Sequence, residues 1–137
     1  MKLYDYPDSG NGYKVRLTLA HLGVACEWTE CDILHGATRT PEFLARNPNG
    51  RIPLLELDDG TCIAESNAII WYLAEGSPLV PYERLARAQV LQWMFFEQYS
   101  HEPYVATPRY IVKHLPAGSP RFTRSRVSGF LSRSRRA

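Results

Sequence analysis

The sequence lacks the features of membrane proteins and of disulfide-bonded proteins. No apolar run approaches the roughly 18 residues that a membrane-spanning helix needs. The first ten residues hold no apolar stretch with a small-residue cleavage site, so we expect no signal peptide and a cytoplasmic location. The three cysteines are odd in number and never occur in CxxC spacing. We therefore expect reduced, packed thiols, with neither a disulfide framework nor a dithiol redox pair.

Acidic residues are absent from the C-terminal part of the chain. Residues 1–108 hold 8 Lys or Arg and 14 Asp or Glu, a net charge of −6, whereas residues 109–137 hold 8 Lys or Arg and no acid, a net charge of +8. Residues 116–137 are rich in Ser and Arg without a hydrophobic period, so we expect a disordered basic tail. Such a tail can contact phosphates, but it has few aromatic residues and no fold of its own. Nucleic-acid binding is therefore not the favoured function.

The N-terminal part has the pattern of a small α/β domain. A strand, an amphipathic helix and a second strand within the first 33 residues form a βαβ unit. A Thr-Pro pair then opens a short helix, and Asp58-Asp59-Gly60 predicts a hairpin turn between two strands. The predicted elements are, in order, strand 2–6, helix 11–22, strand 27–33, helix 41–45, strand 51–57, strand 61–64 and helix 67–76.

A second, helical region follows a linker with two prolines, residues 77–81. The apolar spacing predicts a helix over residues 83–99, and Pro103 and Pro108 are expected to break the pattern before another helix near residues 110–115. The expected parts of the chain are an α/β domain over 1–77, a helical segment over 82–115 and the basic tail over 116–137.

Four stretches of this sequence resemble glutathione S-transferases of bacterial type. They are LYDYPDSGNGYKVRLTLAHLG, FLARNPNGRIPLLELDDG, AESNAIIWYLA and RLARAQVLQWMFFEQY, and together they cover about residues 1–115. The pair N-P-x-G-x-x-P and E-S-x-A-I is far more specific than either motif alone. The resemblance implies a thioredoxin-like N-terminal domain of class α/β, with a mixed four-stranded sheet in the order βαβ-α-ββα. It also implies that the all-α segment is truncated relative to the family.

The resemblance implies a site for glutathione, the co-substrate of the family. Pro53 is expected to follow a cis peptide bond, and the backbone of Ile52 would pair with the cysteinyl part of glutathione as an added strand does. Ser66 would bind the α-carboxylate of the γ-glutamyl end at a helix N-terminus, and Glu65 would bind the α-ammonium group. The alternative is that these residues only form a turn and a helix cap.

Two basic residues are weaker candidates for the glycyl carboxylate of glutathione. Arg51 and His35 are assigned to it by analogy with basic residues of the family. His35 is equally compatible with a solvated loop histidine.

Residues 6–17, YPDSGNGYKVRL, hold the candidates for activation of the thiol. A free thiol has a pKa near 8.5, and lowering it by about two units requires roughly 2.7 kcal/mol of preferential thiolate stabilisation. A hydrogen bond to a charged group supplies about 1.5–3 kcal/mol and a helix N-terminus about 0.3–1 kcal/mol, so one hydroxyl at the start of the helix is enough in magnitude. The family uses a serine or an asparagine in this turn, or in other classes a tyrosine. We therefore rank Ser9 first, Asn11 second and Tyr6 third, with a simple helix cap as the alternative for Ser9.

The expected function is that of a glutathione transferase. The thiolate would attack an electrophilic small molecule, or reduce a peroxide or a disulfide, in a homodimer that needs no metal and contacts no membrane. The alternative is a remnant that binds glutathione weakly or not at all and has no acceptor site, because the helices that would form that site are missing from the sequence.

Overall fold

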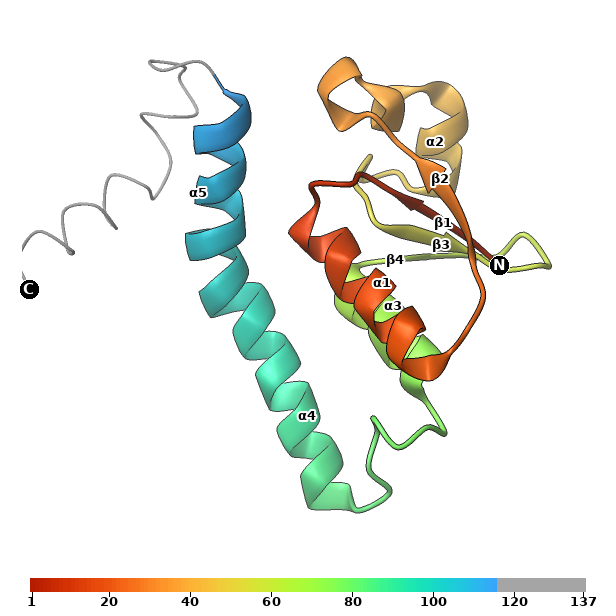
Figure 1. The fold of residues 1–137 in the computed structure, drawn as a ribbon, viewed down its shortest axis with the longest axis vertical. Coiled ribbons are helices and arrows are strands. Elements are labelled where there is room, and N and C mark those ends of the chain that lie inside the picture. Colours follow the sequence, from red (N-terminus) through yellow and green to blue (C-terminus); the bar gives the residue numbers. More distant parts are fainter. Residues whose placement is uncertain (116–137) are drawn as a thin grey trace, which may run out of the picture. The chain divides into compact units, whose positions relative to one another are not determined.

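The first 82 residues form an α/β unit around a four-stranded sheet (Figure 1). The computed structural model describes residues 1–115 and divides the chain into this unit, Met1–Tyr82, and a second unit that begins at Glu83. The strand order is β2-β1-β3-β4, with β1 parallel to β2 and β3 antiparallel to both β1 and β4. The mixed sheet and the thioredoxin-like order predicted from the sequence are thereby confirmed.

The elements of the first unit follow the predicted order, with shorter strands than the sequence pattern indicates. Two short 3₁₀ turns, Ile33–His35 and Ala37–Arg39, occupy the segment between the second strand and the second helix. The strands and helices are β1 (Lys2–Asp5), α1 (Gly10–Leu22), β2 (Glu27–Glu30), α2 (Pro41–Arg46), β3 (Leu54–Glu56), β4 (Cys62–Ala64) and α3 (Ser66–Ala74).

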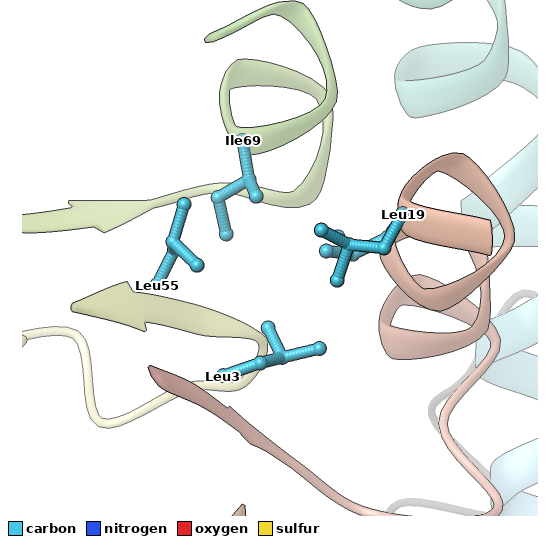
Figure 2. Close-up of a cluster of buried hydrophobic side chains, with 5 residues drawn as sticks. Leu3, Leu19, Leu55 and Ile69 are labelled. Carbon is cyan, nitrogen blue, oxygen red and sulfur yellow. The ribbon is translucent and has the colours of Figure 1, made fainter. Parts of the chain in front are cut away.

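Helices α1 and α3 pack on one face of the sheet, and α2 packs on the other. The core on the first face joins Leu3 and Leu55 of the sheet to helix residues that include Leu19 and Ile69 (Figure 2). Leu54 points to the opposite face, where it packs with the buried Phe43 and Cys31, because neighbouring strand residues face opposite sides of a sheet. Each buried side chain of this size contributes about 1.5–3 kcal/mol by leaving water.

Local signals fix the start of α2 and the β3–β4 hairpin as predicted. The Thr40 hydroxyl accepts a hydrogen bond from the Phe43 N–H at 3.2 Å, and Pro41 occupies the first turn, where no N–H donor is needed. In the hairpin, the Leu57 N–H donates to the Thr61 carbonyl at 2.8 Å. Gly60 adopts a φ of +84°, a left-handed conformation that glycine accepts without a steric penalty.

The second unit is helical across both prolines, so the expected break there was wrong. Its described residues form α4 (Arg84–Phe96), a π-helical turn, η3 (Glu97–His101), and α5 (Glu102–His114). Pro103 is the second residue of α5 and directly follows the π-helical turn, so its ring lies at the junction of two helical segments. Pro108 lies inside α5, where its ring removes one backbone donor, and the helix continues beyond it.

Several predicted absences concern the described part of the chain. No helix within residues 1–115 combines the length and the apolar character needed to cross a bilayer. In the same range, no group of three or more His, Cys, Asp or Glu residues could hold a metal ion. The three cysteines are free, and burial raises the pKa of each thiol. The basic tail predicted over residues 116–137 lies outside the described residues.

Candidate functional site

The strand pairing brings three of the predicted site segments to one end of the sheet. Tyr4 pairs with Leu54 in the β1–β3 ladder, and Leu54 pairs with Ala64 in the β3–β4 ladder. The next residues beyond these pairs are the end of β1 before helix α1, Pro53 before β3, and Glu65 before helix α3. Both helix N-termini and the proline therefore lie at the same edge of the first unit.

Ser66 and Asn11 meet at this edge although they are 55 residues apart in sequence. Ser66 is the first residue of α3 and is only 4% exposed, while Asn11 lies half-buried in the first turn of α1. The Ser66 hydroxyl is 3.5 Å from the Asn11 side-chain oxygen, a long hydrogen bond with the hydroxyl as donor. The structure thus joins one residue predicted for the γ-glutamyl end to one predicted for the thiolate.

Ser9 is the N-cap of α1. Its Oγ accepts a hydrogen bond from the Gly12 N–H at 3.0 Å, and its backbone is extended. A hydroxyl oxygen that accepts one hydrogen bond can still donate its own proton. Within residues 1–115 no other group receives that proton in a hydrogen bond. The cap role and a role as hydrogen-bond donor are therefore compatible in this geometry.

Helix α3 begins differently, because the residue before it provides no side-chain cap. The preceding residue, Glu65, is exposed and makes no capping hydrogen bond. Its φ is 69°, a left-handed conformation that costs a non-glycine residue about 1–3 kcal/mol. Such strain at a helix start is often kept where a ligand needs a particular backbone direction.

The Ile52–Pro53 peptide bond is cis, as predicted. Asn47, a residue that the sequence analysis did not single out, organises the loop before it. The buried Asn47 side chain donates to the Arg51 carbonyl at 2.8 Å and accepts from the Asn49 N–H at 3.2 Å. One buried amide thus holds the loop whose last residues lead into the cis peptide.

The two basic candidates lie on the surface with different partners. The Arg51 side chain is exposed and makes no hydrogen bond or ion pair within the described residues. The His35 ring is exposed as well, and its Nδ1 lies 2.6 Å from a carboxylate oxygen of Asp32. This contact holds the pKa of the Asp32 carboxyl below its usual range. No hydrogen bond of the described residues links either basic side chain to Ser66 or Asn11.

Tyr4 makes its side-chain contacts on the α2 face of the sheet. Its hydroxyl donates to Glu56 at 2.7 Å, its ring meets Phe43 edge-on, and the Arg46 guanidinium lies 5.5 Å from its centre. Burial and the Glu56 hydrogen bond raise the pKa of Tyr4 to about 12. These contacts do not suit a donor to the thiolate. Tyr6 lies nearer the turn, where its carbonyl accepts from the Ser9 N–H at 2.9 Å.

A buried carboxylate under the start of α1 is the main feature that the sequence analysis missed. Asp5, the last residue of β1, is fully buried and forms an ion pair with Arg16 of α1. Burial raises the pKa of Asp5, and the Tyr6 N–H and the Arg16 guanidinium oppose that shift. An acid after an aromatic strand gives no sequence signal of burial, because acids are almost never fully buried unless paired.

The sequence and the structure of this chain are similar to those of known proteins. The family model described as glutathione S-transferase, N-terminal domain, matches residues 1–75. A solved glutathione S-transferase from Pseudomonas fluorescens is 51% identical, with a TM-score of 0.84 over 98% of this chain and 65% of that chain. Ure2p in complex with glutathione is 30% identical, with a TM-score of 0.74 over 82% of this chain and 50% of that chain.

A further relative is similar in sequence. The maleylacetoacetate isomerase of Rhizobium meliloti is 44% identical over 91 residues, which are 64% of this chain and 42% of that protein. The chain thus spans less than two thirds of the length of each of these relatives.

Proposed function

The chain belongs to the glutathione S-transferase family, and we propose on this premise that it binds glutathione and stabilises its thiolate. The thiolate would then attack an electrophilic small molecule, or reduce a peroxide or a disulfide. The observation that carries the proposal is the meeting of Ser66 and Asn11 at 3.5 Å, between the N-termini of α3 and α1. A relative solved with bound glutathione supports the choice of ligand.

The γ-glutamyl end of glutathione would bind at the start of α3. Its α-carboxylate would accept hydrogen bonds from Ser66 at the positive end of the helix, where the capping residue Glu65 makes no capping hydrogen bond of its own. The exposed Glu65 carboxylate would bind the α-ammonium group. Each charge of the ligand would thus meet a group of opposite sign.

The remaining ligand contacts would come from the loop before β3. The backbone N–H and C=O of Ile52, next to the cis-Pro53, would pair with the cysteinyl part as an added strand does. Arg51 would approach the glycyl carboxylate, since its guanidinium has no ion pair within residues 1–115. His35 is the second candidate for that carboxylate, in competition with its contact to Asp32.

The thiolate would be stabilised at the start of α1. Ser9 would donate its free hydroxyl proton to the sulfur, and the amide group of Asn11 offers a second donor. The first turn of α1 contains no acidic residue that would oppose a negative charge. A hydrogen bond to a charged group contributes about 1.5–3 kcal/mol and the helix end about 0.3–1 kcal/mol. Their sum is enough to lower a thiol pKa by about two units.

The reaction itself would be a nucleophilic substitution or addition. The thiol proton leaves to solvent and the sulfur lone pair forms a bond to the electrophilic carbon. In a substitution the leaving group departs with the bonding electrons, and in an addition the π electrons move to the acceptor, which takes up a proton from solvent. In this half of the chemistry the sulfur is the atom to be activated, and the proposed donors at the start of α1 would do so.

Calorimetric titration of glutathione into the purified chain tests the binding step. We expect binding that the Ser66→Ala variant weakens by about 1–3 kcal/mol, because the ligand carboxylate loses a hydrogen bond. Ser77→Ala is the matched control, since Ser77 follows the other end of α3 and bonds the Ala74 carbonyl at 2.6 Å. Equal affinities of the two variants would refute the assignment of the γ-glutamyl site.

Turnover and assembly need separate measurements. We propose a homodimer, which light scattering of the same sample would detect. Formation of a thioether from glutathione and a panel of electrophiles would establish transferase activity. Binding without turnover on any electrophile, peroxide or disulfide would instead support the alternative hypothesis, a protein that binds glutathione and has no acceptor site.

A further inference from the structure

We propose that Asp5 and Arg16 act as a positioning pair, which holds the turn before α1 so that Ser9 and Asn11 face the sulfur of glutathione. The inference deepens the proposed function and rests on it. Neither residue would touch the ligand. Each would act through the backbone of the turn and of the first helical turn.

Arg16 ties two parts of the turn together. One terminal nitrogen of its guanidinium bonds the Asp5 carboxylate, and the other donates to the Pro7 carbonyl at 3.0 Å. The first contact anchors the end of β1, and the second anchors the turn two residues later. A planar guanidinium can make both bonds at once because its donors lie in a fixed fork.

The Asp5 carboxylate also packs against the first turn of α1. A Cβ atom added at Gly12 would overlap this carboxylate, so the backbone of α1 lies directly against it. The Gly12 N–H is the donor that bonds the Ser9 hydroxyl at 3.0 Å. The carboxylate therefore lies directly against the residue whose N–H holds the Ser9 hydroxyl.

The hydrogen bonding of the buried Asp5 carboxylate is incomplete, which is unusual for a residue that only stabilises a fold. Asp5 is 0% exposed, and its Oδ1 makes no hydrogen bond of normal geometry among the described residues, although the Tyr6 N–H and the Trp28 side chain act on the carboxylate and lower its pKa. An unsatisfied buried acceptor carries a desolvation cost, so a hydrophobic residue would serve stability better. The pair is thus more easily explained by the geometry that it imposes on residues 7–12 than by stability.

Replacing Arg16 by lysine tests this role. The Arg16→Lys variant keeps a positive charge beside Asp5 but cannot bond Asp5 and the Pro7 carbonyl in the same planar geometry. The matched control is Arg46→Lys on the α2 face, where Arg46 contacts Glu56 and the ring of Tyr4. For the parent and both variants, we would measure glutathione affinity, and the thiolate absorbance of the complex as a function of pH.

We expect Arg16→Lys to raise the pKa of the bound thiol, so that the thiolate fraction at a fixed acidic pH falls about threefold or more. Affinity should change less than about twofold, because Ile52 and Ser66 are untouched. Arg46→Lys should leave the thiol pKa as it is in the parent. An unchanged thiol pKa in Arg16→Lys would overturn the inference, and so would an equal shift in the control.

Amide hydrogen exchange separates this inference from the proposed function. Exchange at Gly12 should accelerate in Arg16→Lys and not in Arg46→Lys, whether or not glutathione is present. A parent chain that binds no glutathione would refute the proposed function, and unchanged exchange at Gly12 would refute the positioning pair. If Arg16→Lys fails to fold, the double variant Asp5→Ala with Arg16→Met, which leaves no lone buried charge, is measured in the same way.

Discussion

Helix α1 begins behind a side chain that caps it, whereas helix α3 begins without one. The Ser9 hydroxyl accepts the Gly12 N–H, while Glu65 before α3 makes no such bond and has a φ of 69°. The two helices pack on the same face of the sheet and start at the same edge. The residues that precede these two helices therefore differ in whether their side chain caps the helix. Ser9 caps the start of α1 from within the chain, whereas the start of α3 is where we propose that the glutathione carboxylate binds.

The largest effect on stability is expected at Gly12, where the Asp5 carboxylate packs against the start of α1. Gly12→Ala would force its new methyl group into the Asp5 carboxylate, so we expect the free energy of unfolding to fall by about 3 kcal/mol. Gly10→Ala, one position before Asn11, is the control because nothing lies within 4 Å of its added Cβ. Denaturant unfolding measures both variants, and equal losses would break the contrast between the two glycines.

The next effect concerns the strained start of α3. Glu65→Gly should raise the free energy of unfolding by about 1.5 kcal/mol, because glycine adopts a positive φ without steric strain. The same variant should bind glutathione more weakly, since it lacks the carboxylate proposed for the ammonium group. Glu42→Gly, in the first turn of α2, should instead lower stability by about 1 kcal/mol. A Glu65→Gly protein that is less stable than the parent would contradict the strain argument.

The cap of α1 provides a smaller effect with a second readout. Ser9→Ala should lower the free energy of unfolding by about 1 kcal/mol, the usual cost of losing an N-cap. Thr40→Ala removes the equivalent cap from α2 and should cost a similar amount. Only Ser9→Ala should raise the pKa of the bound thiol. If Asn11→Ala raises that pKa and Ser9→Ala does not, the ranking of the two donors is wrong.

The smallest effect comes from the face that carries no part of the proposed site. Tyr4 has a pKa of about 12 in the folded chain against an ordinary value of 10.0, so its stabilising contribution is complete below pH 10 and is lost as the pH rises toward 12. With solvent screening this loss is below about 1 kcal/mol. In Tyr4→Phe the stability should fall less steeply in that range, as denaturant unfolding at both pH limits would register. Parallel curves for parent and variant would contradict this assignment.

Local patterns in the sequence were enough for much of this architecture. Thr40 before Pro41 predicted a helix start, Asp58-Asp59-Gly60 predicted a hairpin turn, and both are confirmed because each depends on a few adjacent residues. The resemblance also led to the cis peptide before Pro53. The roles of the candidate site residues stay predictions, although Ser66 and Asn11 are now known to lie together.

Features that depend on contacts between distant parts of the chain could not be predicted in this way. The burial of Asp5 requires both Arg16 as a partner and the missing side chain of Gly12, two conditions that no single local pattern contains. The continuity of the helix through Pro103 depends on the π-helical turn before it, which widens the hydrogen-bond spacing without a sequence signal.

The overlap between the Asp5 carboxylate and the space beside Gly12 has a consequence for how these two positions can vary. They share one volume, so a side chain at position 12 can be accepted only if position 5 becomes smaller at the same time. A shorter residue at position 5 in turn leaves Arg16 without its anion and removes the reason for an arginine there. Positions 5, 12 and 16 should therefore change together among homologous sequences, as a linked set.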